Sequence, residues 1–158
     1  MSHPQEPSVK GQVYFYPPEY YVFCNFSAFE IEYNGKKYPT SEHAYQSFKF
    51  VKTNPELAEK IQKAKSAHDA FKLAQEEKSE IDPDWDNIKQ DIMKEILHCK
   101  VEQHPYVQKK LLQSGDREIV EDSWRDDYWG WGKNRDGKNM LGKLWMEVRD
   151  EFRKNKKN

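Results

Sequence analysis

The chain has 158 residues, with 26 lysines and arginines against 27 aspartates and glutamates, and a formal net charge of -1. This length fits one domain that needs no disulfide or metal to fold, and the charge balance argues against a protein held to DNA mainly by phosphate neutralisation. We expect neither a signal peptide nor a membrane span, and therefore a cytoplasmic protein in which Cys24 and Cys99 are reduced thiols.

The first predicted elements surround one clear hairpin signal. Residues 1–11 are polar and contain prolines, so we expect them to be flexible. A short strand is predicted at residues 13–15. The dipeptide Asn34-Gly35 joins two strand-like runs, residues 31–33 and 36–38, and an Asn-Gly pair in this position indicates a two-residue β-turn.

A series of helices is predicted from capping residues and prolines. The first should end near Val51, and the fifth, Pro105–Gln113, should be stopped by Gly115. The expected starting points, in chain order, are Thr40 or Ser41, Asn54-Pro55, Ser66, Asp82-Pro83, Pro105 and Asn139.

Apolar spacing gives the two longest helices a buried side. The fourth carries Trp85, Ile88, Ile92, Ile96 and Cys99, and the last carries Leu141, Leu144, Trp145, Val148 and Phe152. With a further strand at residues 119–121, these elements predict an α+β fold, a mostly helical single domain with a small antiparallel sheet. Its expected bounds are residues 12–153, followed by a basic tail at residues 154–158.

The helix predicted from Thr40 carries three polar residues in one row. At 100° per residue, Glu42, Gln46 and Lys49 lie opposite its apolar side, and Tyr45 borders both sides. One interpretation is a solvated face on which the helix dipole stabilises Glu42 by about 0.3–1 kcal/mol. The other is that the row lines a pocket, because aromatic residues flank it on two sides.

If the row lines a pocket, its members have different chemistry. The dipole keeps Glu42 ionised, which suits a group that stabilises a cation or activates water. Lys49 lies about 10.5 Å further along the axis at roughly 1.5 Å per residue, so the two side chains contact different parts of one substrate. Lys49 is expected either to hold a phosphate or, if buried and neutral, to form a Schiff base with a sugar aldehyde.

A second candidate region is the loop at residues 121–132, which mixes acids with large aromatic residues. Aromatic faces stack nucleobases at about 1–3 kcal/mol each, and crowded like charges favour a protonated carboxyl. One ionised and one protonatable carboxylate across a pocket are what cleavage of a glycosidic bond requires. The simpler interpretation is a packed loop with capping acids.

Other patterns carry less information. The histidines show no ligand spacing, so neither a metal nor another cofactor is expected. Residues 132–139 nearly match a phosphate-binding loop, but Asn139 stands where the magnesium-binding hydroxyl is needed. Trp85, at the start of its helix, is interpreted either as core or as a pocket wall.

Several motifs follow one another in a fixed order along the chain. They are Phe23-Cys24-Asn25-Phe26, Pro39-Thr40-Ser41-Glu42-His43 with Gln46 and Lys49-Phe50, Asp84-Trp85 with Lys89 and Met93, Lys100 and Gln103, Leu111-Leu112 with Gly115-Asp116, Val120-Glu121, Asp126 before Tyr128-Trp129-Gly130, Asn139-x-Leu141-Gly142, and Met146-Glu147-x-Arg149. From about Phe15 to Arg149, this order resembles the NADAR family, also called YbiA-like.

The resemblance implies an N-glycosidase that cleaves the bond between a ribose-phosphate group and a base nitrogen. One branch of the family acts on ribosylamino-pyrimidine intermediates of riboflavin synthesis, and another removes ADP-ribose from guanine in nucleic acid. We take the second as the expected activity, with ADP-ribosylated DNA or RNA as the partner. The alternatives are the first activity and a module that binds ADP-ribose without cleaving it.

The resemblance also implies site residues. Glu42 resembles the family's catalytic acid, and Lys49 and Asp126 are expected to act with it in catalysis. Two departures from the family pattern bear on substrate choice: Cys24 stands where Ser is usual, and Gln75-Glu76 stands where Gly-Arg is often found. The expected substrate-binding residues are Asn25, Phe26, Tyr45, Gln46, Trp85, Glu121, Tyr128, Trp129, Gly130 and Asn139.

Overall fold

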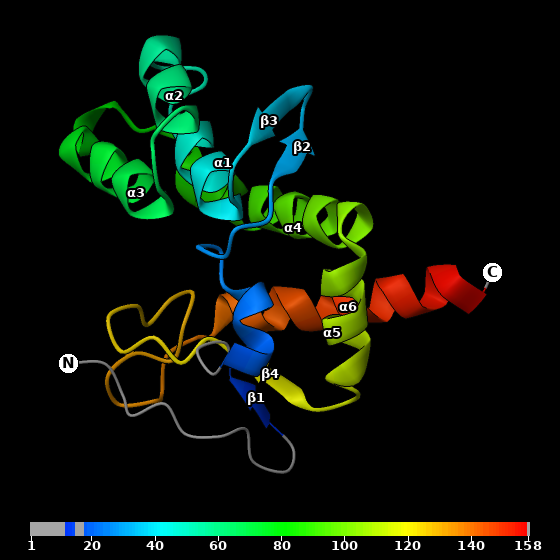
Figure 1. Cartoon of the computed structure of the whole chain (residues 1–158). Helices are drawn as coiled ribbons and strands as arrows, with labels where there is room; N and C mark the ends of the chain where they lie inside the picture. Colours follow the sequence, from blue (N-terminus) through cyan, green and yellow to red (C-terminus); the bar gives the residue numbers. More distant parts are fainter. Residues whose placement is uncertain (1–11, 15–17, 158) are drawn as a thin grey trace. The chain divides into compact units, whose positions relative to one another are not determined.

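The computed structural model describes residues 12–14 and 18–157 (Figure 1). The chain divides into two compact units, one formed by Asn25–His104 and the other by Met1–Cys24 together with Pro105–Asn158. The flexible segment predicted at residues 1–11 and the last residue of the first predicted strand lie outside the described residues. The domain bounds expected from the sequence stay a prediction.

The unit Asn25–His104 consists of a hairpin followed by helices (Figure 1). Its elements in chain order are strands β2 (Ile31–Tyr33) and β3 (Lys36–Tyr38), helices α1 (Ser41–Phe48), α2 (Pro55–Gln62) and α3 (Ala67–Glu76), the short 3₁₀ helix η2 (Lys78–Glu80), and the long helix α4 (Trp85–Gln103).

The predicted hairpin is confirmed. Strands β2 and β3 pair antiparallel, with Ile31 opposite Tyr38 and Tyr33 opposite Lys36. The two turn residues both adopt positive φ, 51° at Asn34 and 79° at Gly35. This is the conformation that a two-residue turn needs to match the twist of its strands, and it is the reason for the Asn-Gly pair.

Side-chain caps begin the first three helices, as predicted. Thr40 Oγ1 accepts a hydrogen bond from the backbone N–H of His43 at 3.2 Å in α1. The equivalent bonds in α2 and α3 are made by Asn54 and Ser66, at 3.1 and 3.0 Å. Each cap satisfies one of the backbone donors that a helix leaves open at its first turn. Helix α1 ends at Phe48 rather than near Val51.

The buried face of α4 differs from the predicted apolar row. Trp85 and Ile96 are buried as expected, but Ile88, Ile92 and Cys99 are only half-buried. The residues buried instead lie about one position further round the helix: Met93, Leu97, Lys100 and Val101. The row was therefore wrong for three of its five members, because periodicity gives the spacing of a buried face but not which side the neighbours cover.

A separate apolar cluster joins the end of α1 to α2 and α3. It consists of Phe50, Ala58, Ile61, Ala70 and Ala74, all at most 5% exposed. Small alanines on both helices allow a close approach to Phe50 and Ile61. This cluster fixes α2 and α3 against α1, the helix that carries the predicted catalytic row.

The other unit contains strands β1 (Gln12–Tyr14) and β4 (Glu118–Val120), the 3₁₀ helix η1 (Pro18–Phe23), and helices α5 (Pro105–Gln113) and α6 (Met140–Lys157). Strands β1 and β4 pair in parallel, with Gln12 opposite Glu118. The sequence predicted strands in both places but not their pairing. Helix α5 has the predicted bounds, and φ is +60° at Gly115, which follows it.

Helix α6 supplies the core of this unit. Trp145 packs 5.0 Å from the Phe23 ring and donates a hydrogen bond from Nε1 to the Phe23 carbonyl at 3.0 Å. Leu141, Leu144, Trp145 and Val148 are buried, as predicted, whereas Phe152 is only half-buried. The basic segment that follows is part of the helix, which continues to Lys157.

The predicted fold class is confirmed: the chain is α+β, mostly helical, with a small antiparallel sheet formed by β2 and β3. The parallel pair of β1 and β4 adds a second small sheet. In the part of the chain that the structure describes, no helix has the length and apolar character needed to cross a membrane.

The hairpin turn gives a first testable prediction. A Cβ at Gly35 would contact nothing within 4 Å, so replacement by alanine changes only the backbone preference. We expect Gly35→Ala to lower the free energy of unfolding by about 1 kcal/mol, the cost of a left-handed conformation for a residue with Cβ. Urea denaturation measures this change, and Asn34→Gly, which keeps the turn permissive, should alter it by much less. A Gly35→Ala variant as stable as the wild type would contradict the turn geometry.

Candidate active site

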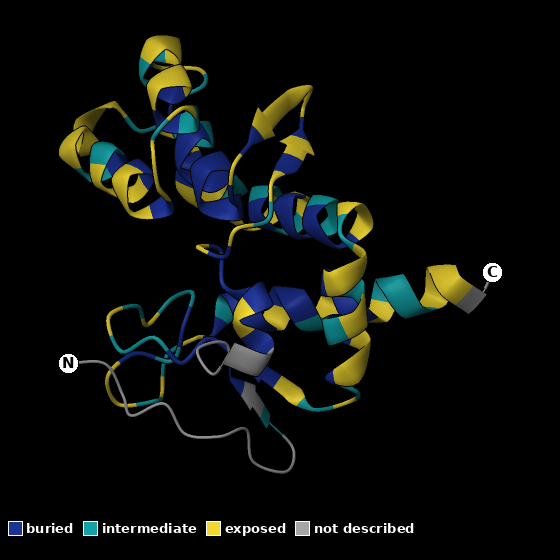
Figure 2. Ribbon diagram, in the orientation of Figure 1, coloured by how far each residue is buried: buried dark blue, intermediate teal, exposed yellow. Residues whose placement is uncertain are grey.

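Helix α1 is buried along nearly its whole length, although most of its side chains are polar. Residues 41–47 are all buried, and α1 is drawn almost entirely in the buried colour in Figure 2. The solvated interpretation of the row is therefore wrong for Glu42 and Gln46, which are 6% and 3% exposed. Lys49, just after the helix, is half-buried. Buried polar side chains need hydrogen-bond partners, so this row is a candidate ligand-binding site.

Glu42 lies in the first turn of α1, and its position is fixed from two sides. Its backbone N–H donates to the carbonyl of Asn25 at 3.0 Å. Its side chain accepts a hydrogen bond from Gln46 Nε2 at 3.4 Å, from one turn further along the helix. The positive end of the helix dipole favours a carboxylate at this position. A buried carboxylate is thus held ready at the start of α1.

Three buried polar atoms close to Glu42 in the sequence or the structure have no hydrogen bond to any of the described residues. They are Asn25 Oδ1, Ser41 Oγ and Gln46 Oε1. Gln46 Nε2 donates to Glu42, so its Oε1 is the acceptor left over, and Asn25 Nδ2 donates to Met93 Sδ at 3.5 Å. Buried acceptors in folded proteins almost always have a partner. These atoms therefore match a ligand or water that brings hydroxyl or amine donors.

An aromatic pair adjoins the polar row. The rings of Tyr45 and Trp85 lie 5.2 Å apart with an interplanar angle of 57°, and Trp85 is 6% exposed. Lys49 Nζ lies over the Tyr45 ring, 5.2 Å from its centroid. An ammonium over an aromatic face is stabilised in its charged form. This contact favours the charged role predicted for Lys49 over that of a neutral nucleophile.

His43, which follows Glu42, has both ring nitrogens engaged. Nδ1 lies 2.8 Å from Thr40 Oγ1, and Nε2 lies 3.0 Å from the carbonyl of Ala64. A carbonyl can only accept, so Nε2 carries the proton and Nδ1 accepts from the threonine hydroxyl. Burial lowers the pKa of His43, although the Ala64 carbonyl and Asp69 act in the opposite direction. His43 therefore joins α1 to the Ala64 carbonyl, a structural role that the sequence pattern did not reveal.

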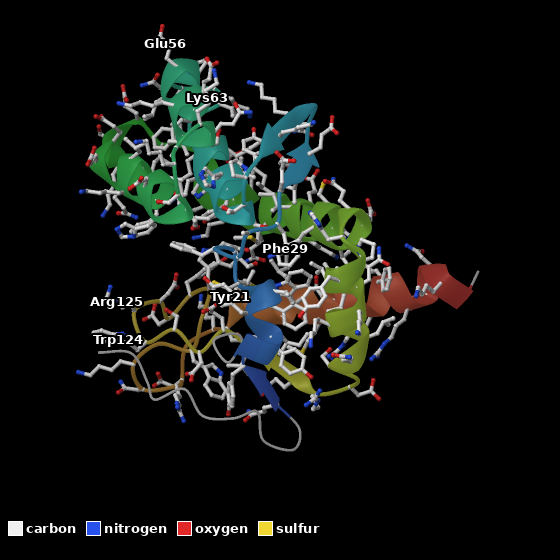
Figure 3. The ribbon with its side chains drawn as sticks, viewed as in Figure 1. Tyr21, Phe29, Glu56, Lys63, Trp124 and Arg125 are labelled. Atoms are coloured by element: carbon white, nitrogen blue, oxygen red, sulfur yellow. The ribbon has the colours of Figure 1, made fainter. Side chains whose placement is uncertain are left out.

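The acidic and aromatic loop belongs to the other unit and is closed by its own hydrogen bonds. Backbone N–H groups of Trp131, Gly137 and Asn139 donate to the carbonyls of Glu121, Trp131 and Gly130 at 2.7–2.9 Å. Figure 3 labels Trp124 and Arg125 in this loop, where the guanidinium lies over the indole at 5.3 Å. The loop is therefore packed, as the simpler of the two interpretations predicts.

Asp126 has a definite local role in this loop. Its Oδ1 accepts hydrogen bonds from the backbone N–H groups of Tyr128 and Trp129, at 2.9 and 2.8 Å. The rings of these two residues pack edge to face with centroids 4.8 Å apart. Asp126 thereby sets the orientation of the aromatic pair. A second oxygen, Oδ2, remains for the catalytic role predicted from the sequence.

Gly130 and Asn139 also hold the loop. A Cβ at Gly130 would lie 2.8 Å from the carbonyl oxygen of Glu121 and 2.9 Å from that of Asp126, so only glycine fits. Asn139 was expected to cap α6, but that expectation is wrong for its side chain. With φ at 49°, Asn139 accepts from the Glu121 N–H and donates to the Ile119 carbonyl, both at 2.9 Å. It ties the end of β4 to the start of α6.

Glu121 follows β4 and is 6% exposed. The pKa of Tyr21 is raised by burial first, then by the Cys24 thiol and by the charge of Glu121. Tyr21 is 40% exposed. Tyr21 belongs to none of the sequence motifs, so the sequence did not indicate it as a candidate residue.

The predicted site residues fall into two groups, one in each unit. In the unit Asn25–His104, direct contacts link Asn25, Glu42 and Gln46 in one set and Tyr45, Lys49 and Trp85 in another, whereas Phe26 is 37% exposed. The other unit links Glu121, Asp126, Tyr128, Trp129, Gly130 and Asn139. Ser41, with its buried hydroxyl, joins the first group and was missed because serine at that position was explained as a cap.

Comparison with known proteins identifies the class. The model of the NADAR domain family matches residues 14–153. The N-glycosidase YbiA of Escherichia coli is 34% identical over 134 residues, which cover 85% of this chain and 82% of YbiA. An NMR structure of E. coli YbiA superposes with a TM-score of 0.84 at 32% identity, covering 99% of this chain and 91% of that one.

Two further relatives agree with this class. An N-glycosidase of Nostoc punctiforme is 36% identical over 144 residues, covering 89% of this chain and 92% of its own length. A riboflavin biosynthesis protein of Vibrio vulnificus is 36% identical over 142 residues, covering 89% of this chain but 38% of its own length. The chain belongs to the NADAR family, as its motifs predicted.

The buried histidine gives a testable pH dependence of stability. Because the folded state lowers the pKa of His43 below its ordinary value of 6.5, the unfolded chain binds this proton first as the pH falls. The stabilisation that depends on neutral His43 is complete above about pH 6.5 and is lost as the pH falls toward the folded pKa. The wild type should therefore lose more free energy of unfolding than His43→Gln between about pH 7.5 and 5.5.

Urea denaturation at the two pH values measures this difference. His68→Gln is the control, because His68 belongs to the same unit and its side chain is exposed. Equal losses in the wild type and His43→Gln would contradict the assignment of a neutral, buried His43.

Proposed function

We propose that this N-glycosidase of the NADAR family removes ADP-ribose from guanine in nucleic acid, with Glu42 as the central catalytic group. One observation carries the assignment of the site. A buried carboxylate, positioned by Gln46 and Asn25, lies among buried acceptors that have no partner in the part of the chain that the structure describes, and the same helix carries one ring of an aromatic pair. Such an arrangement suits a substrate with hydroxyl donors, an aromatic base and a developing positive charge.

The reaction breaks one bond and consumes one water. The C1′–N bond electrons leave with the base nitrogen, which takes up a proton, and positive charge develops over C1′ and the ring oxygen of the ribose. Glu42 stabilises that charge as a carboxylate and accepts a proton from the water that attacks C1′. The products are ribose with a hydroxyl at C1′ and a base with an N–H.

The other members of the row bind the substrate. Gln46 Oε1 and Asn25 Oδ1 accept from ribose hydroxyls, which supply the donors that the buried acceptors need. Tyr45 and Trp85 provide the aromatic surface. Lys49, in its charged form over the Tyr45 ring, binds a phosphate of the ADP-ribose.

The sequence also predicted catalysis by the loop of the other unit, and we propose that one of its carboxyls supplies a proton during the reaction. Asp126 Oδ1 accepts two backbone hydrogen bonds, which makes Oδ2 the oxygen proposed for this role. Glu121 is the second candidate, because its carboxyl is buried. Comparison of Asp126→Asn with Glu121→Gln assigns the role, since only the proton donor should regain activity with substrates whose base is a better leaving group.

A second candidate substrate is a ribosylamino-pyrimidine phosphate. It is supported by the name of the V. vulnificus relative, a riboflavin biosynthesis protein. The same buried row would serve, because the bond broken again joins a ribose C1′ to nitrogen. The two substrates differ in the base and in the phosphate group, and a product assay separates them.

The test is mass spectrometry of the products. The protein is incubated with a guanine-ADP-ribosylated oligonucleotide and, separately, with the ribosylamino-pyrimidine phosphate. We expect release of ADP-ribose, and we expect Glu42→Gln to lower kcat by about 10²–10⁴-fold, the typical contribution of an acid–base group. The matched control is Glu56→Gln, because Glu56 is also a first-turn acid but is exposed at the start of α2 (Figure 3).

Other outcomes lead to other assignments. Cleavage of the pyrimidine alone would replace the proposed substrate by the second candidate. A third outcome is that ADP-ribose binds equally well to the wild type and Glu42→Gln while neither substrate is cleaved. This would contradict the proposed catalytic activity and favour a module that only binds ADP-ribose. Equal activity of Glu42→Gln and the wild type would contradict the assignment of Glu42 as the central catalytic group.

The role of Lys49 gives a separate prediction. If Lys49 binds phosphate as a cation, Lys49→Arg should keep kcat within a few fold, whereas Lys49→Met should raise KM with a smaller effect on kcat. Steady-state kinetics measures both constants, and Lys52→Met is the control because the Lys52 side chain is 73% exposed. A Schiff-base role would appear instead as loss of activity in both Lys49 variants and as a borohydride-trapped adduct in the wild type.

A further inference from the structure

Helices α2 and α3 form a groove lined by lysines on the unit that contains Glu42. The groove has a volume of about 480 Å³. Lys60 lies on α2, Lys72 on α3, and Lys63 and Lys65 on the segment between the two helices, while Asp69 and Glu76 of α3 also line the groove. Lys63, the residue after the end of α2, is labelled in Figure 3. None of these residues belongs to the proposed catalytic row.

The positive charge of this groove is local. Lys63 is paired with Glu59 at 2.7 Å, but Lys60, Lys65 and Lys72 are exposed. Over residues 25–104 acidic residues outnumber lysines, and that stretch contains no arginine. A surface that gathers lysines within an otherwise acidic unit attracts anions to one place.

We propose that this groove binds the phosphate backbone of a single-stranded nucleic acid whose modified base is the substrate. The inference rests on the proposed function and deepens it, because it selects a polymer over a free nucleotide. Lysine suits this task, since its ammonium is a point charge on a flexible stem that follows phosphates without reading bases. The two acids in the lining limit the contact to a short stretch of backbone.

The groove is connected directly to the catalytic helix. The carbonyl of Ala64, which lies in the groove lining, accepts the hydrogen bond from His43 Nε2 at 3.0 Å. His43 follows Glu42 in α1. Axes of packed helices lie about 8–10 Å apart, so a strand in the groove passes about one helix diameter from the helix that carries Glu42. The base to be cleaved must be unpaired to reach it, which is why the partner is a single strand.

The number of lysines sets the expected strength of salt dependence. Three exposed lysines neutralise about three phosphates, and the slope of log K against log salt is about −0.7 per phosphate for single strands. The affinity should therefore fall about 20-fold between 50 and 200 mM salt. This modest slope agrees with the near-neutral charge of the chain.

The test is fluorescence anisotropy with an unmodified single-stranded DNA of about 12 nucleotides. The full chain is compared with the triple variant Lys60→Gln, Lys65→Gln and Lys72→Gln. The control triple, Lys37→Gln, Lys52→Gln and Lys78→Gln, removes the same charge from exposed lysines of the same unit that do not line the groove. The groove variant should lose most of the affinity and of the salt slope, and the control should keep both.

Equal losses in the two triple variants would overturn the inference, because net charge and not the groove would then be responsible. Failure of the wild type to bind the strand would also overturn the inference, and would favour an acidic protein surface as the ligand of the groove. Cleavage of ADP-ribosylated guanosine, a substrate without a backbone, is measured in parallel. Cleavage of the nucleoside should be unchanged in both variants. A wild type that cleaves the nucleoside but does not bind the strand rejects the groove, whereas a wild type that does not cleave the nucleoside rejects the proposed function.

Discussion

Helix α1 is made largely of polar residues and is nevertheless buried, and the elements around it are arranged to satisfy those residues. Thr40 and His43 form one set of bonds, which ends on the Ala64 carbonyl, and Ser47 donates to the Ala58 carbonyl at 2.8 Å. These bonds hold α1 against α2 and the segment before α3. Burial of an unpaired polar group costs about 1–3 kcal/mol, so each of these bonds constrains the packing of its neighbours.

A second set of α1 groups is treated differently. The backbone and side chain of Glu42 are fixed by Asn25 and Gln46, yet these two partners keep buried acceptor atoms that receive no hydrogen bond from the described residues. One polar set of the helix therefore binds protein, and the other is the set that we propose to bind a ligand. On that proposal, one short helix is both a structural centre and a substrate-binding element.

In the other unit, side chains expected to bind substrate also hold a loop in shape. Asp126 orders the amides of Tyr128 and Trp129, Gly130 permits a close approach of two carbonyls, and Asn139 joins β4 to α6. Replacement of these residues would therefore disturb loop structure as well as any direct contact. For Gly130 and Asn139 the structural role alone accounts for a restricted choice of residue.

Local features of the fold could be predicted from the sequence because their causes are local. The Asn34-Gly35 turn, the caps at Thr40, Asn54 and Ser66, and the bounds of α5 depend on a few neighbouring residues. The parallel pairing of β1 with β4 joins segments about a hundred positions apart, and no local pattern marks such a partner.

Part of the candidate site could also be predicted from the sequence. The periodicity of α1 placed Glu42, Gln46 and Lys49 in one row, and the motifs gave the family. The periodicity could not reveal that this row is buried, because burial depends on how α2 and α3 pack against α1. Nor could the sequence show that Glu121 acts on Tyr21, that His43 bonds to the Ala64 carbonyl, or that the Ser41 hydroxyl is buried, because all three depend on how the chain folds.

The account depends most on the claim that the buried acceptors around Glu42 receive the donors of the substrate. Nuclear magnetic resonance of the Glu42→Gln variant, titrated with ADP-ribose, tests this claim without relying on turnover. The account predicts that the side-chain amide signals of Asn25 and Gln46 and the indole signal of Trp85 shift together and saturate at one affinity. Saturable binding that leaves these signals unchanged would contradict it and would place the ligand elsewhere.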